Sequence, residues 1–100
     1  MDDKNIVTDT DVKGLSGAEV SYKLYPNPTH STFTVELHSP MHDASPVSIY
    51  ILSMRGEVIE QRTVEAGQPA VFSLEGHQPG VYLVRILFAD QIFVERLIKR

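Results

Sequence analysis

Few side chains in this sequence belong to the types that carry out catalysis or bind metals. Cysteine is absent from the 100 residues, which excludes thiolate metal sites, disulfides and a cysteine nucleophile. A histidine pair four residues apart binds metal when both lie on one face of a helix. Here His38 and His42 fall at an expected strand end and in a proline-bracketed loop. With His30 and His77 also expected in or beside loops, we predict no catalytic residue, metal or cofactor.

A second candidate for chemistry is the alternating Thr-Asp run at residues 8–11. Calcium prefers such carboxylates, but an EF-hand loop also needs a closing glutamate at a fixed spacing, which is missing. Residues 1–20 contain few large apolar side chains and bury too little to offset the entropy of ordering. We therefore predict a flexible linker, or the tail of an upstream cargo region, at 1–20, and a folded domain at 21–100.

The overall composition excludes several classes of protein. The net charge is −4, which argues against nucleic acid as a partner because phosphate binding depends on Lys and Arg. No apolar run approaches the ~20 residues that span a bilayer. The acidic, polar start lacks the basic and apolar parts of a signal peptide.

The elements that would position any site are short strands. Valine, isoleucine and aromatic residues alternate with polar ones, and Gly or Pro turn signals recur every 8–12 residues, which predicts an all-β, immunoglobulin-like antiparallel β-sandwich of about seven strands. The expected strands are residues 20–25, 32–38, 47–54, 57–64, 70–74, 81–89 and 92–98.

Three further expectations concern individual elements. The prolines at 26 and 28 should form a rigid corner that carries the chain from one sheet to the other. The charged strand at 57–64 should lie at a sheet edge. Strand 81–89 is apolar on both faces, so it should be central or have one face covered by a partner, and its Arg85 should reach a sheet rim or a carboxylate.

Four motifs, in order and at fitting spacings, resemble a known family. A Tyr-Pro-Asn-Pro corner precedes a Phe-x-Val strand, an apolar strand runs into a glycine turn, a Gly-x-Tyr-x-Val strand follows, and a basic-apolar pattern ends the sequence. Together they resemble the type A C-terminal sorting domain of the type IX secretion system of Bacteroidota. The matching residues are Tyr25, Pro26, Asn27, Pro28, Gly56, Gly80, Tyr82 and the final Arg96, Leu97, Ile98, Lys99 and Arg100. Where the family usually has Asp in the glycine turn, this chain has Ser53.

The resemblance implies a secretion signal covalently linked to an upstream cargo domain. Such proteins cross the inner membrane, are read in the periplasm by shuttle proteins and an outer-membrane translocon, and reach the cell surface or medium. A surface sortase usually removes the domain and often joins the cargo to lipopolysaccharide. In this sequence the cut would fall at an unidentified bond within residues 1–22.

Translocon recognition would fall on Arg96, Leu97, Ile98, Lys99 and Arg100, whereas the earlier motif residues are expected to be mainly structural. One physical account is that strand 91–100 stays partly open and is read by edge pairing. A second is that this strand is ordinary sheet whose basic residues only aid solubility. If the domain is a sorting signal, removing the last few residues should abolish sorting with the fold largely kept.

One alternative remains for the whole domain. An immunoglobulin-like accessory module could bind carbohydrate or act as a spacer in a surface protein, and it should tolerate that truncation. An exposed final hairpin could also form a strand-mediated homodimer when the domain is isolated.

Overall fold

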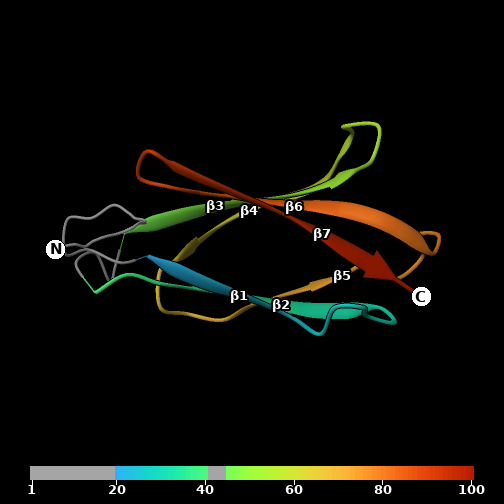
Figure 1. The fold of residues 1–100 in the computed structure, drawn as a ribbon, viewed down its shortest axis with the longest axis horizontal. Helices are drawn as coiled ribbons and strands as arrows, with labels where there is room; N and C mark the ends of the chain where they lie inside the picture. Colours follow the sequence, from blue (N-terminus) through green and yellow to red (C-terminus); the bar gives the residue numbers. More distant parts are fainter. Residues whose placement is uncertain (1–19, 41–44) are drawn as a thin grey trace, which may run out of the picture.

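A computed structural model describes residues 20–40 and 45–100 of the chain, and it confirms an all-β sandwich (Figure 1). Each observed strand lies within one or two residues of its expected limits. No helix long and apolar enough to cross a bilayer occurs in the part of the chain that the structure describes. The strands are β1 (Ser21–Tyr25), β2 (Thr32–His38), β3 (Pro46–Ser53), β4 (Val58–Glu65), β5 (Ala70–Ser73), β6 (Gly80–Phe88) and β7 (Gln91–Lys99).

The strands form two antiparallel sheets that pack face to face. One sheet has the order β1-β2-β5 and the other the order β4-β3-β6-β7. Figure 1 shows the two layers, with β3 and β6 in the upper layer and β1 and β2 in the lower one, while β7 runs diagonally from the upper layer toward the lower one at the C-terminus. The expected edge position of β4 and the central position of β6 are both confirmed.

The core follows from the alternation of side chains along each strand, which places every second residue between the sheets. In β2 the predicted inward residues Phe33, Val35 and Leu37 are all buried. Phe33 stacks on Phe72 of β5 with ring centroids 5.5 Å apart. From the other sheet, the fully buried side chains are Val47, Ile49, Ile51, Val84, Ile86, Phe88 and Leu97.

An arginine closes the open side of the sandwich between the edge strands β4 and β5. The Arg62 guanidinium carbon lies 4.1 Å from the centroid of the Phe72 ring, and Nη1 donates a hydrogen bond to the Val71 carbonyl at 2.8 Å. Its other terminal nitrogen pairs with Glu60 on the same strand. This cluster shields the core where no strand covers it.

The prediction that the proline corner carries the chain between sheets is wrong. β1 and β2 are neighbours in the same sheet, and Tyr25 pairs with Thr34 directly across the corner. Both prolyl bonds, Tyr25–Pro26 and Asn27–Pro28, are cis. The chain changes sheets later, between β2 and β3, between β4 and β5, and between β5 and β6.

The prediction for Arg85 is also wrong. Arg85 lies on a central strand, and its guanidinium carbon is 5.0 Å from the ring centroid of its cross-strand partner Tyr50. No carboxylate pairs with it among the described residues, and its buried Nε has no hydrogen-bond partner there. The face of an aromatic ring carries partial negative charge, so it takes the place of the expected carboxylate.

Several sequence predictions lie outside the described residues. They are the flexible linker over most of 1–20, the acidic run at 8–11, most of the region predicted to contain the cleaved bond, and His42.

Candidate functional site

The last strand, β7, has one edge hydrogen-bonded to β6 and the other facing away from that sheet. Its odd-numbered side chains point into the sandwich, as the burial of Leu97 shows, and its even-numbered side chains point out. At the outer edge, the backbone groups of Arg96, Ile98 and Arg100 face the proline corner. The predicted recognition segment and the first family motif therefore lie side by side.

Asn27 uses its side-chain amide to continue the sheet beside β7. Its Nδ2 donates to the carbonyl of Arg96 at 2.8 Å, and its Oδ1 accepts from the N–H of Ile98 at 3.0 Å. A carboxamide presents one donor and one acceptor much as a peptide group does, so it substitutes for a residue of a neighbouring strand. The two motifs are joined across 69 and 71 residues of sequence.

Thr29 completes this contact with its backbone. Its N–H donates to the Ile98 carbonyl at 2.8 Å, and its carbonyl accepts from the N–H of Arg100, also at 2.8 Å. The residue is buried, and its hydroxyl donates to the Thr32 carbonyl and accepts from the N–H of Ser31. We call the four hydrogen bonds made by Asn27 and Thr29 to the end of β7 the corner lock.

Sequence reasoning missed the corner lock. It gave Asn27 only a structural role in an extended corner and did not single out Thr29. The available signal was an amide side chain held between two prolines, a position where its own backbone is fixed and its side chain is free to pair.

The corner lock corrects the expectation that residues 91–100 leave an open edge. Backbone pairing beside residues 96–100 is already occupied by the corner. Within β7, the first half, around Ile92 and Val94, has no partner on its outer side among the described residues.

Leu97 is a core residue and not a surface contact. It is 0% exposed and packs in the main apolar cluster. Truncation at this residue would remove part of the core together with the corner lock. The expectation that the fold is largely kept when the last residues are removed is therefore not supported for any cut that takes Leu97.

The basic residues around Leu97 are placed differently from one another. Arg96 and Arg100 are exposed, whereas Lys99 directs its ammonium to the carbonyl of His77 in the loop before β6. The end of β7 thus offers two free guanidinium groups beside a lysine that is already engaged.

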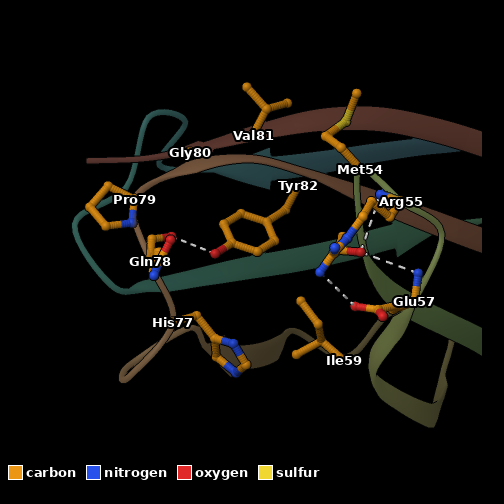
Figure 2. A pocket seen from close by; sticks show the side chains of 11 residues that line it. Met54, Arg55, Glu57, Ile59, His77, Gln78, Pro79, Gly80, Val81 and Tyr82 are labelled. Carbon is orange, nitrogen blue, oxygen red and sulfur yellow. Dashed lines mark hydrogen bonds and ion pairs between the residues drawn. The ribbon is translucent and has the colours of Figure 1, made fainter.

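Gly80 and Tyr82 line a shallow hollow at the same end of the sandwich (Figure 2). The hollow has a volume of about 430 Å³ and lies between the β3–β4 turn and the loop before β6. Tyr82 is buried, and its hydroxyl donates to the Gln78 carbonyl. Gly56, with φ 88°, makes the β3–β4 turn that borders the hollow, in a backbone region that disfavours side chains with a Cβ.

The turn at Gly56 also accommodates Ser53, which stands where the family usually has Asp. The Ser53 Oγ accepts hydrogen bonds from the backbone N–H groups of Arg55 and Glu57, at 3.3 and 3.2 Å. A serine hydroxyl organises a turn in the way an aspartate carboxylate does, though more weakly.

Inside the sandwich, β1 contacts β7 through a tyrosine. The Tyr22 ring lies 5.3 Å from that of Phe93, and its hydroxyl hydrogen-bonds the Glu95 carboxylate. Burial, followed by this hydrogen bond and the nearby negative charge, raises the pKa of Tyr22 to about 12. Only the protonated phenol can donate to Glu95, so Tyr22 holds the sheets together through this hydrogen bond only while its side chain is neutral.

This contact predicts a loss of stability at alkaline pH. The pKa of Tyr22 is about 12 in the folded protein and about 10 when unfolded. Its contribution is therefore complete below pH 10 and is lost as the pH rises toward 12. For a partly exposed group we expect a loss of about 1 kcal/mol. Urea unfolding at pH 8 and 11.5 should show that the free energy of unfolding falls less in Tyr22→Phe than in the parent. An equal fall in the two proteins would contradict the prediction.

Apart from the exposed Val71 of β5, the outer face of the other sheet is largely polar. Tyr25 donates to Glu36, and His38 Nε2 lies 3.2 Å from a Glu36 oxygen. The hydrogen bond from Tyr25, and then that from His38, lowers the pKa of Glu36. Among the described residues, no group of three or more His, Cys, Asp or Glu side chains is arranged to hold a metal ion.

These features define an antiparallel sandwich domain whose final strand is fixed by an N-terminal proline corner. The family model described as "Secretion system C-terminal sorting domain" matches residues 23–100, which includes both parts of the corner lock. The chain belongs to this family, the C-terminal sorting domains of the type IX secretion system. Membership implies an exported protein in which the domain is attached to an upstream cargo and interacts with the secretion system. No curated protein matches the chain.

Proposed function

We propose that this sorting domain is read in the periplasm by shuttle and translocon proteins of the outer membrane, which then pass the attached cargo to the cell surface. A surface sortase would cut within residues 1–22 and join the cargo to lipopolysaccharide. In this proposal the domain acts as a signal and carries out no catalysis. The corner lock supports it, because it combines the first and last family motifs into one surface.

Within this surface we propose that side chains, rather than backbone edges, carry the recognition. Asn27 and Thr29 occupy the edge beside residues 96–100, and Leu97 is buried. The groups that remain for a partner are the exposed side chains of Arg96, Ile98 and Arg100.

The test is export of a fusion. A reporter with an inner-membrane signal is joined to the full 100-residue chain in a host with type IX secretion. The comparison variant carries Arg96→Ala and Arg100→Ala, which keeps Leu97 and every backbone hydrogen bond of the corner lock. The intact fusion should reach the surface or medium, and the variant should accumulate in the periplasm.

Two outcomes would oppose the proposal. If the intact fusion stays in the periplasm, the chain does not act as a sorting signal, and an accessory module becomes the better account. If both fusions are exported equally, recognition does not depend on these arginines.

A further inference from the structure

The outward face of β6 and β7 is unusually apolar for a solvent-facing sheet. Ile92 is 64% exposed and Val94 55% exposed, and β6 adds apolar side chains beside them. We call this surface the β6–β7 face. Its members are Leu83, Arg85 and Leu87 of β6 and Ile92, Val94 and Arg96 of β7.

The opposite surface of the sandwich shows what a solvated face looks like in the same protein. There, the outward side chains of β1 and β2 form a polar network centred on Glu36. Contiguous exposed apolar surface in a soluble domain marks an interaction site. The contrast therefore assigns the interaction surface to the side of the sandwich that carries the β6–β7 face.

The charges on the β6–β7 face specify the chemistry of its partner. The chain carries a net charge of −4, yet Arg85 and Arg96 are the charged residues that β6 and β7 turn outward, and neither strand places a carboxylate there. Arg85 is half-buried against Tyr50 and has no carboxylate partner among the described residues. An arginine fixed in this way is ready to bind an incoming carboxylate with its planar guanidinium.

The same charges argue against a second copy of this chain as the occupant. In a two-fold symmetric contact the same patch lies on both sides. The β6–β7 face would then bring two arginines from each copy into one interface to which β6 and β7 contribute no carboxylate, and such like charges oppose association. A surface that combines apolar side chains with a carboxylate fits better.

We propose that the β6–β7 face is a docking surface for a protein of the secretion system that presents apolar side chains around a carboxylate. This rests on the proposed sorting function and extends the contact region at the end of β7 across the sheet, with Arg96 common to both parts. The partner would contact the outward side chains of β6 and β7 rather than a backbone edge, with Arg85 as the central anchor. Tyr and Arg are the residue types that most often serve as such anchors.

Two substitutions test the docking surface in the full-length fusion. Arg85→Met removes the charge but keeps an apolar side chain over Tyr50, so stability should be unchanged or slightly raised. Val94→Asp places a carboxylate on the face. Its matched control is Val71→Asp on the outer face of the other sheet, because Val71 is 57% exposed and Val94 is 55% exposed.

We expect Arg85→Met and Val94→Asp each to lower the exported fraction roughly tenfold, the effect of losing one anchor contact. Thermal unfolding of the purified chains should show that both variants stay folded, and Val71→Asp should be exported like the parent. Export of both face variants at the parent level would overturn the docking surface while leaving the sorting function intact. Equal loss in Val71→Asp would also overturn it. A parent that is not exported overturns the sorting function itself.

Two measurements exclude other occupants. Light scattering would reveal a dimer, and dissociation of that dimer by Val94→Asp would assign the face to a second copy. Co-sedimentation with phosphatidylglycerol vesicles that Arg85→Met abolishes would assign it to anionic lipid. Either result would overturn the proposal.

Discussion

Replacing Leu97 by alanine should lower the free energy of unfolding by about 2–5 kcal/mol. Leu97 is 0% exposed and lies on the last strand, where it packs with the cluster formed by both sheets. Removing its side chain loses apolar burial and leaves a cavity that the rigid sandwich fills only in part. Urea unfolding monitored by circular dichroism measures the effect.

Ile98 provides the matched control for this prediction. It follows Leu97 on the same strand, but its side chain points outward and is 41% exposed. Ile98→Ala should therefore cost less than Leu97→Ala, about 1 kcal/mol, because less apolar area is buried there and no enclosed cavity is left. Equal costs at the two positions would show that Leu97 does not act through the core. A C-terminal truncation that abolishes export must be interpreted accordingly, since removing Leu97 also weakens the fold.

Replacing Asn27 by alanine should release the end of β7. The amide makes two hydrogen bonds to β7, at the Arg96 carbonyl and the Ile98 N–H. Because the site is solvent-exposed, the global loss should be about 1–2 kcal/mol. The local effect should be larger, with amide exchange at Ile98 and Arg100 about tenfold faster or more, since both N–H groups donate to the corner lock.

Gln61→Ala is the control for Asn27→Ala. Gln61 is also an exposed amide, but its side chain bonds only to Thr63 on its own strand in the structure. Its removal should leave exchange at Ile98 and Arg100 unchanged. If Asn27→Ala also leaves amide exchange at Ile98 and Arg100 unchanged, Thr29 alone holds the end of β7, and the Asn27 amide is not needed to position that strand end.

The sequence predicted the strands well because their signal is local. Alternation in residues 32–38 and the two apolar faces of residues 81–89 directly reflect which side chains are buried. The charged strand was correctly placed at an edge for the same reason. The resemblance in four motifs identified the family, and the match over residues 23–100 agrees with it.

The errors concern contacts between residues distant in sequence. The amide between two prolines indicates a side chain that is free to pair, but nothing local in residues 26–28 identifies β7 as its partner. Prolines also fit a crossing between sheets as well as a connection within one. The environment of Arg85 depends on the register that brings Tyr50 beside it. The same limitation hid the role of Leu97, because a terminal apolar residue has a similar local pattern whether it is buried or exposed.

The corner lock also has a kinetic consequence. Its side-chain bonds connect positions 69 and 71 residues apart, so the chain must close a very long loop before they form. Contacts of such high sequence separation make all-β domains slow to fold. We expect the intervening strands to assemble first and the corner to engage β7 late. A secretion component that binds only the locked surface would thereby discriminate against domains that have not finished folding.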